Sequence, residues 1–481
     1  MASRQVTGNY IGGRWVESGS DATIPVVNPA TEDVIAVVTA GSADDADLAV
    51  GAARDAFAGW SATPPAQRGE FVAAMGEALR GRAEELAATL TAELGVPRHL
   101  AMASQVANPV AKFASHAELA AVFPWESRAG RSTLVRTPVG VAVAIAPWNF
   151  PLNQAVDKIA PALIAGCPVV LKPSEVTPSC ALALAEAADE AGLPPGVFNL
   201  VNGAGATVGE ALVSHPGVDI VSFTGSTATG RHIASVAAGR VARVVLELGG
   251  KSPTVLLDDA DLDIAVPAAV KACFLNSGQI CVSLSRLLVH HGQYEDVVER
   301  VRDVAGGYTV GDPCTRVDLG PLASRAQLDT VRGYIASGID AGARLVTGGI
   351  EPPPGLGRGF YVRPTVFADV ENSMTIAQEE IFGPVLSVIA YRDEDDAVRI
   401  ANDSPYGLSG CVWSRDLERA ARVARRLRAG TVKLNGAGDP NAPFGGFKQS
   451  GIGREHGRFG IEEFVELQAV VYPAGCAGER P

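Results

Sequence analysis

Apolar runs and helical stretches alternate along the chain from residue 139 onward. Runs rich in Val, Ile, Leu and Ala occur at 139–145, 169–171, 197–200, 220–223 and 243–246. Ala-rich stretches with helical spacing lie between them, at 154–165, 178–191, 207–214 and 227–238. Continuous apolar strands that alternate with helices are typical of a parallel sheet covered on both faces. The pattern predicts a doubly wound α/β domain, whose ligands bind beyond the carboxyl ends of its strands.

A second α/β series begins after Lys251. Its predicted strands are 254–257, 287–289, 385–389, 410–413 and 431–434. Its predicted helices lie near 260–273, 294–305, 324–341, 393–401 and 416–427. We therefore expect two doubly wound α/β domains. Their hinge is expected at Gly249 and Gly250, because paired glycines permit a sharp turn and close packing.

The segment before residue 139 has a different pattern. The first 40 residues alternate short apolar runs with turn residues, which indicates strands. Ser42 is followed three positions later by Asp45, and this spacing predicts a capped helix that runs to about Trp60. A single long helix is predicted over 66–94.

Composition narrows the class of protein. The chain has 481 residues, which is too long for one ordinary core, and its net charge of -13 disfavours nucleic acid or an anionic membrane as partner. No apolar stretch approaches the roughly 20 residues that span a bilayer. The first residues lack the apolar segment of a signal peptide, so a cytoplasmic location is expected.

The seven cysteines predict neither a disulfide framework nor a metal site. Their number is odd, their spacing is wide, and no Cys-x-x-Cys pair occurs. The default for each is a small buried hydrophobe, and this includes Cys476 near the end of the chain. Cys281 differs from this default, because the residues around it indicate a catalytic thiol.

Cys281 ends the run Asn-Ser-Gly-Gln-Ile-Cys, and Glu247 begins the run Glu-Leu-Gly-Gly-Lys. A free thiol is only a few per cent thiolate at neutral pH, so a nucleophilic cysteine needs activation. The Glu247 carboxylate could remove the thiol proton, directly or through water. The alternative is a structural role. Glu247 would then be a helix-cap or salt-bridge carboxylate, and Gly249 and Gly250 would form a plain turn.

Asn149 lies in the run Pro-Trp-Asn-Phe-Pro at the end of the first strand of the predicted sheet. A neutral amide there can donate to an oxyanion, which is worth on the order of 10²–10³ in rate. An Asn that bonds its own backbone in a turn is the alternative. Lys158 lies nine positions later, on the predicted helix.

Two turns could hold a dinucleotide. Lys172 and Glu175 follow a strand and could bind the hydroxyls of an adenine ribose, where a carboxylate would repel the 2′-phosphate of NADP. A surface turn with a solvated ion pair would look the same. The run that contains Phe223, Gly225 and Ser226 ends a strand and opens a helix, whose N-terminus suits a pyrophosphate. An ordinary strand–helix turn is again the alternative.

Taken in order, seven such runs resemble the signatures of the aldehyde dehydrogenase superfamily. They are Pro-Trp-Asn-Phe-Pro at 147–151, Lys-Pro-Ser-Glu at 172–175, Phe-Thr-Gly-Ser at 223–226, Glu-Leu-Gly-Gly-Lys at 247–251, Gly-Gln-Ile-Cys at 278–281, Glu-Glu-Ile-Phe-Gly-Pro at 379–384 and Pro-Phe-Gly-Gly-Phe-Lys at 443–448. The resemblance covers about residues 10–472 and implies an enzyme that uses NAD in preference to NADP.

The resemblance implies residue roles. Cys281 matches the nucleophile, Glu247 the general base and Asn149 the oxyanion donor, while Lys158 and Glu466 match a proton relay. Glu380 matches a contact to the nicotinamide ribose, and the Phe382 side chain is expected near the ring. The other implied cofactor contacts come from Ala146, Pro147, Trp148, Lys172, Ser174, Glu175, Gly205, Phe223, Gly225, Ser226 and Leu248.

The implied reaction converts an aldehyde to a carboxylic acid. Cys281 attacks the aldehyde, hydride passes to NAD, and Glu247 activates the water that hydrolyses the thioester. Two alternatives stay open: transfer of the acyl group to coenzyme A, which a carboxylate base disfavours, and a non-catalytic scaffold or binding protein that retains the fold.

The family plan also implies a division of the chain: a Rossmann-like NAD-binding domain from 1–115 and 139–250, a catalytic domain from 251–450, and a small β oligomerisation arm from 116–138 and 451–481. A homodimer or homotetramer follows from it. At the substrate entrance, Ile280, Val282 and Val156 are apolar and the segment 435–443 has no aromatic side chain, so an apolar uncharged aldehyde is expected.

Overall fold

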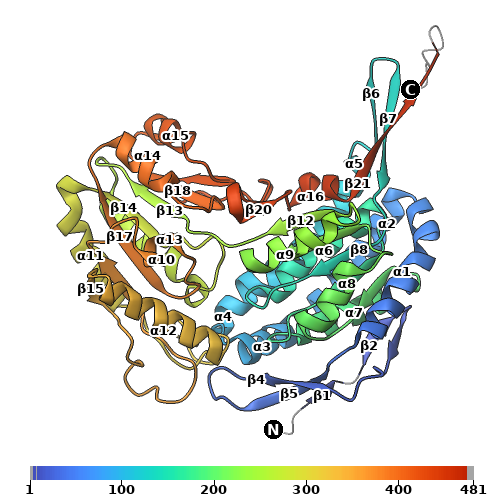
Figure 1. Cartoon of the computed structure of the whole chain (residues 1–481), viewed down its shortest axis with the longest axis horizontal. Helices are drawn as coiled ribbons and strands as arrows, with labels where there is room; N and C mark the ends of the chain where they lie inside the picture. The colour runs from blue at the N-terminus through green and yellow to red at the C-terminus, as the bar shows by residue number, and fades with distance from the viewer. Residues whose placement is uncertain (1–3, 7, 474–481) are drawn as a thin grey trace.

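The computed structural model describes residues 4–6 and 8–473 of the chain. Two α/β lobes lie side by side, and a narrow β arm extends from one of them (Figure 1). Cys476, expected to be a small buried hydrophobe, lies outside the described residues. Within the described ranges, no helix is both long and apolar enough to cross a membrane.

The first lobe contains an eight-stranded sheet with the strand order β20-β12-β11-β8-β9-β10-β2-β3. The five strands from β12 to β10 are parallel, whereas β20, β2 and β3 pair antiparallel. The strands are β2 Asn9–Ile11, β3 Arg14–Val16, β8 Ala142–Ile145, β9 Val169–Lys172, β10 Phe198–Leu200, β11 Ile220–Thr224, β12 Arg243–Glu247 and β20 Gly451–Ile452. The chain reverses direction across the sheet between β8 and β11, so a ligand crevice is expected there.

Helices cover both faces of this sheet, and its core has two layers. Val169 and Leu171 pack in one apolar cluster, while the intervening Val170 packs in another. The helices and helical turns of this lobe are α1 Ala43–Ala62, α2 Pro65–Gly81, α3 Ala83–Leu94, α4 Arg98–Leu100, η1 Ala101–Val106, α5 Ala107–Val122, α6 Pro151–Ala165, α7 Ser179–Glu190, η2 Gly205–Gly209, α8 Glu210–Ser214, α9 Thr227–Ala238 and α16 Gly457–Glu463. The doubly wound fold predicted from the alternation of apolar strands and helices is confirmed.

The single long helix predicted over 66–94 is wrong, because the chain breaks at Arg82 (φ -108°, ψ 14°). The Arg82 guanidinium forms ion pairs with Glu186 and Glu190 of α7. The break lets α2 pack along α5 while α3 turns to pack on η1 and α7. Tertiary packing therefore overrides the continuous helical propensity of this stretch.

The second lobe contains a seven-stranded sheet with the order β15-β16-β17-β14-β13-β18-β19, in which β15 alone of these strands pairs antiparallel. Its strands are β13 Pro253–Leu256, β14 Arg286–His290, β15 Arg344–Thr347, β16 Thr365–Ala368, β17 Val385–Tyr391, β18 Ser409–Trp413 and β19 Thr431–Leu434. Its helices and helical turns are α10 Leu262–Phe274, η3 Leu275–Gly278, η4 His291–Gln293, α11 Tyr294–Gly306, α12 Arg325–Asp340, α13 Thr375–Gln378, α14 Glu394–Asn402, α15 Leu417–Ala424 and η5 Lys448–Ser450. The sequence pattern missed β15 and β16.

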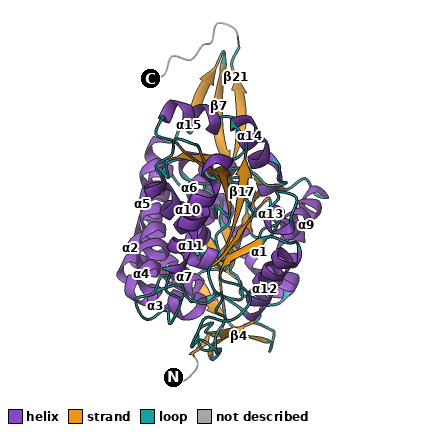
Figure 2. Cartoon of the chain, turned by 90° about the vertical axis from the view of Figure 1, so that its left-hand side faces the viewer, coloured by secondary structure: helices purple, strands orange, loops and turns teal. Residues whose placement is uncertain are grey.

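The arm is a three-stranded antiparallel sheet of β6 Glu126–Ala129, β7 Ser132–Pro138 and β21 Val465–Val471. Strand β21 pairs with β7 along its whole length, and the arm projects beyond the helical layers (Figure 2). A separate small sheet contains β1 Arg4–Val6, β4 Thr23–Val27 and β5 Val34–Thr39.

The boundaries expected for the arm are too wide. Residues 116–122 belong to α5, which packs on α2, and residues 451–463 form β20 and α16 of the first lobe. Strand β20 joins the edge of the eight-stranded sheet beside β12. The first lobe is therefore completed by a segment that follows the second lobe in sequence.

Candidate active site

Cys281 lies on a tightly constrained loop after α10. Asn276, Ser277 and Gly278 have φ values of 53°, 56° and 74°, so three successive residues are left-handed. A Cβ atom on Gly278 would lie 2.1 Å from the carbonyl carbon of Gly383, so only glycine fits. The Ser277 hydroxyl donates to the Gly320 carbonyl at 2.9 Å and holds the loop in place. Strain supported in this way is typical of functional sites.

Asn149 is hydrogen-bonded to this same loop. The Asn149 side-chain Nδ2 donates to the Gln279 backbone carbonyl at 3.0 Å. The Asn149 backbone carbonyl accepts from Asn276 Nδ2 at 3.1 Å and from Gln105 Nε2 at 2.9 Å. The side chain is buried at 5% exposure. An amide nitrogen carries two donors, so a second N–H remains for a ligand oxygen. The structure thus brings together the amide and the loop that the sequence singled out.

The Cys281 side chain is partly exposed, and the carboxylates of Glu380 and Glu247 both influence it. Burial is the main cause that raises the pKa of the Cys281 thiol, and the two carboxylates raise it further. The Cys281 carbonyl packs against Gly250, where a Cβ atom would approach it to 2.4 Å. Burial and the two carboxylates therefore favour the protonated thiol, which must lose its proton before the sulfur can attack.

Glu247 ends β12 and is buried, at 1% exposure. Neither carboxylate oxygen has a hydrogen-bond partner among the described residues. Burial, followed by the charge of Glu455, raises the pKa of Glu247 well above its usual range, while Lys158 acts in the opposite direction. A carboxyl group with a raised pKa is suited to accept a proton near neutral pH.

Lys158 forms a buried ion pair close to this carboxyl group. Its Nζ lies 2.5 Å from Glu455 Oε1 and donates to Thr224 Oγ1 at 2.6 Å. Glu455 itself is buried, and its second oxygen has no partner among the described residues. An antiparallel bridge to Phe444 fixes its backbone.

Glu466 does not lie where the expected relay role requires it, and Glu455 pairs with Lys158 instead. Glu466 lies on β21, is 54% exposed and pairs with Arg243 at 3.0 Å. Arg243 begins β12 whereas Glu247 ends it, so about 13 Å of strand separate them. Glu455 lies in the run Gly-Arg-Glu-His at 453–456, which begins after four residues that follow the Pro-Phe-Gly-Gly-Phe-Lys run, and no local signal in this run indicates a contact with Lys158.

A cavity of about 720 Å³ lies at the carboxyl ends of β8, β9 and β11. Ten of the residues expected to contact the cofactor line it: Ala146, Pro147, Trp148, Lys172, Ser174, Glu175, Gly205, Phe223, Gly225 and Ser226. Ser226 caps α9, whose free N–H groups are oriented as a pyrophosphate site requires. Residues that the sequence did not indicate, such as Val213 and Ile233, add an apolar wall.

A carboxylate lies at the rim of this cavity. Glu175 Oε1 accepts from the Gly205 backbone N–H at 2.9 Å, and its other oxygen lies 3.6 Å from Lys172 Nζ. Burial lowers the pKa of Lys172. A carboxylate and an ammonium on one rim fit the two hydroxyls of a ribose.

The three remaining expected cofactor residues lie beside the hinge. The Phe382 ring contacts Trp148 edge-on, with 5.2 Å between centroids, so the two lobes meet at the cavity wall. Glu380 Oε1 accepts from the Gly250 N–H at 3.2 Å, and burial raises the pKa of Glu380 to about 7. Leu248 packs against Gly230 of α9, where a Cβ atom would approach it to 2.4 Å.

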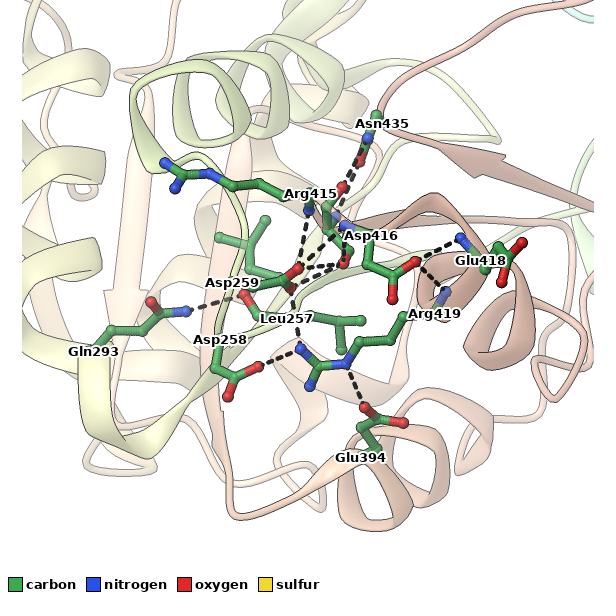
Figure 3. Close-up of polar contacts among 12 residues, drawn as sticks. Leu257, Asp258, Asp259, Gln293, Glu394, Arg415, Asp416, Glu418, Arg419 and Asn435 are labelled. Atoms are coloured by element: carbon green, nitrogen blue, oxygen red, sulfur yellow. Dashed lines mark hydrogen bonds and ion pairs between the residues drawn. The ribbon is translucent and has the colours of Figure 1, made fainter.

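The segment 435–443 is anchored at its start by a polar cluster (Figure 3). Ser414 N–H donates to Asn435 Oδ1 at 3.0 Å, and Asn435 Nδ2 donates back to the Ser414 carbonyl at 2.9 Å. The Asp259 carboxylate accepts from the Ser414 hydroxyl and from the backbone N–H of Asp416. These bonds fix the segment to the ends of β13 and β18.

Of the three apolar residues expected at the substrate entrance, one lies elsewhere. Ile280 and Val282 are partly exposed on either side of Cys281. Val156 is completely buried in the core of the first lobe, so its placement at the entrance is wrong. Helical geometry turns its neighbour Asp157 to a different face of α6, where Asp157 pairs with Lys112.

Sequence similarity to known proteins extends over almost the whole chain. The profile of the aldehyde dehydrogenase family matches residues 15–470. A 3-succinoylsemialdehyde-pyridine dehydrogenase from Pseudomonas sp is 48% identical over 465 residues, which are 96% of this chain and 98% of that protein.

Solved structures agree with this match. A mutant of aldehyde dehydrogenase C from Pseudomonas syringae, in complex with NAD+ and octanal, has a TM-score of 0.95 and 48% identity, covering 97% of this chain and 96% of that one. An aldehyde dehydrogenase from Mycobacterium tuberculosis with NAD+ has a TM-score of 0.96 and 43% identity, covering 98% and 99%. The chain therefore belongs to the aldehyde dehydrogenase family and is an NAD-dependent aldehyde dehydrogenase.

Proposed function

We propose that Cys281 is the nucleophile in the oxidation of an aldehyde to a carboxylic acid. Its sulfur adds to the aldehyde carbon as the thiolate, after the thiol proton has passed to water, and the oxyanion accepts hydrogen bonds from Asn149 Nδ2 and from the Cys281 backbone N–H. NAD, when bound in the cavity, supplies the acceptor for the hydride. The observation that carries this proposal is the bond of Asn149 to Gln279, two residues before Cys281, because it holds the donor beside the thiol.

Glu247 is the general base that activates water for hydrolysis of the thioester. Its raised pKa and its freedom from hydrogen bonds among the described residues support the role. Lys158 and Glu455 pass the proton onward through their ion pair. Such a base does not suit transfer to coenzyme A, and the intact set of Cys281, Glu247 and Asn149 does not suit a scaffold without catalysis.

The enzyme prefers NAD to NADP. Glu175 presents a carboxylate at the cavity rim beside Gly205, and a 2′-phosphate bound there would meet a like charge. Lys172 donates to the Pro173 carbonyl at 2.6 Å and pairs with Glu175. Its positive charge is therefore already balanced and does not attract a 2′-phosphate.

The substrate is an uncharged aldehyde with an apolar portion next to the reacting carbon. Ile280 and Val282 flank the nucleophile and offer apolar surface there. The octanal bound by the Pseudomonas syringae enzyme and the pyridine semialdehyde named for the Pseudomonas relative are both uncharged, which supports this class.

The arm joins copies of the chain into a homodimer or homotetramer. Strand β21 is an edge strand, and it exposes Leu467, Val470 and Val471 at 59%, 40% and 67%. An exposed apolar edge pairs readily with a further strand. Analytical ultracentrifugation checks this, and a monomer at micromolar concentration would contradict it.

A panel of aldehydes assayed for NADH with both cofactors tests the proposed function. We expect octanal to be oxidised with NAD, and we expect Cys281→Ala to abolish turnover while NAD binding persists. Turnover by the Cys281→Ala variant would overturn the assignment of the nucleophile.

A further inference from the structure

A second cavity, of about 330 Å³, lies between α5, the segment 435–443 and the start of α16. Its polar lining residues include Lys112, His116, Asn441 and His456, and its apolar ones include Leu119 and Pro440. None of these residues has a role in the reaction described above. The cavity is therefore a candidate for recognition.

Helix α6 connects the reaction centre with this cavity. In α6, which the structure describes in full, Asn153 is the one residue that is not buried. Asn153 Nδ2 donates to Asp157 Oδ2 at 3.2 Å, one turn further along the same face. The helix begins two residues after Asn149, so its polar face leads from the oxyanion donor to Asp157 over about 9 Å.

Asp157 in turn contacts the cavity wall. Its two carboxylate oxygens accept from Lys112 Nζ at 2.6 and 2.7 Å, and Lys112 Nζ also lies 3.1 Å from His456 Nε2. An ammonium group has three donors, so all three N–H groups of Lys112 are used. Its charge is balanced by Asp157, and Glu118 also lines the cavity, so the site does not favour an anionic ligand.

His116 lines the cavity and carries an unpaired ring nitrogen. Its ring is 1% exposed, and Nδ1 lies 2.8 Å from the Lys112 carbonyl, which can only accept a hydrogen bond. Nδ1 therefore carries the proton, and burial lowers the pKa of His116, which favours the neutral ring. Nε2 is then an acceptor, and it has no partner among the described residues. A ligand that satisfies it must bring an O–H or N–H donor.

We propose that this cavity binds the far end of the substrate, and that it selects a medium-chain aldehyde with a neutral terminal hydroxyl group. The hydroxyl donates to His116 Nε2 and accepts from His456, whose Nδ1 carries the proton when Nε2 accepts from Lys112. The end of the alkyl chain packs against Leu119 and Pro440, the apolar part of the lining. The proposal rests on the proposed function and adds the substrate class to it.

Comparison of 8-hydroxyoctanal with octanal tests the proposal, because the pair differs only in the terminal hydroxyl. We expect kcat/KM of the wild type to be about fivefold higher for 8-hydroxyoctanal, the gain typical of one net hydrogen bond. We expect this ratio to fall to one in His116→Phe, which keeps a planar ring but has no acceptor. His291→Asn, an exposed histidine on the second lobe, is the matched control and should keep the wild-type ratio.

Each outcome decides a separate claim. The hydroxyl site is overturned if the ratio of kcat/KM for 8-hydroxyoctanal to that for octanal is near one in the wild type, or is unchanged in His116→Phe. The proposed function still holds in either case if octanal is oxidised. Absence of NADH from both aldehydes overturns the proposed function. Calorimetric binding of both aldehydes to Cys281→Ala with NAD then still tests the site, since equal affinities would overturn it.

Discussion

Lys158 and Glu455 form a buried ion pair with Nζ and Oε1 2.5 Å apart, although 297 positions separate them in the chain. The pair lies beside Glu247, and its two charges act on that carboxyl group in opposite directions. The chain passes through the whole second lobe before it returns with Glu455. The environment of the proposed base is thus completed by a segment that follows the second lobe in the chain.

Glu247→Gln should separate acylation from hydrolysis of the thioester. The amide cannot accept a proton, so the steady-state rate should fall about 10²-fold or more. A first turnover of NADH should persist, because the positive charge of the nicotinamide ring of bound NAD favours the Cys281 thiolate without help from Glu247, and hydride transfer precedes hydrolysis. Stopped-flow absorbance at 340 nm measures both phases. Steady-state rates equal to those of the wild type would contradict the assigned base.

Glu455→Gln should shift the pH dependence of turnover. The negative charge of Glu455 raises the pKa of Glu247, so its removal lowers that pKa. A base works in its deprotonated form, and therefore the rising limb of kcat against pH should move to lower pH. Glu466→Gln is the matched control and should leave the limb in place. A shift of the limb in Glu466→Gln, with none in Glu455→Gln, would show that Glu466 and not Glu455 acts on the base.

Glu175→Gln should relax the choice of cofactor. Removal of a charge beside the ribose should raise kcat/KM for NADP by about tenfold, with a smaller loss for NAD. Initial rates with each cofactor at a fixed aldehyde concentration provide the check. If the NADP rate does not change, Glu175 does not face the 2′ position.

Glu93→Gln should alter how stability depends on pH. Burial raises the pKa of Glu93 to about 7, and its carboxylate oxygens accept from Ser179. The native state therefore holds a proton that the unfolded chain has lost between about pH 4.5 and 7, so this contribution to stability is present below pH 4.5 and lost as pH rises through 7.

The unfolding midpoint of Glu93→Gln, relative to wild type, should accordingly rise between pH 5 and pH 8. Calorimetry at several pH values measures it, with Glu77→Gln on the exposed face of α2 as control. A difference that stays constant with pH would show that Glu93 is ionised in the native state.

Sequence reasoning located the strands that carry the site but not every partner that the fold supplies. The apolar runs around Val170 and Val221 are buried on both faces, so their pattern is unambiguous. Glu455 was missed because its partner Lys158 is 297 positions away, and no local pattern reports such a contact. Val156 and Asp157 are buried neighbours on α6, and only the helix orientation shows which of them faces Lys112.

The most direct test of covalent catalysis by Cys281 is to trap the acyl group on the protein. Glu247→Gln would be incubated with NAD and octanal, quenched in acid and digested for mass spectrometry. The assignment of Cys281 as the nucleophile predicts an octanoyl thioester on the peptide that contains Cys281, in an amount equal to the NADH of the first turnover. An unmodified Cys281 alongside NADH release, or an acyl group on Cys273 instead, would contradict it.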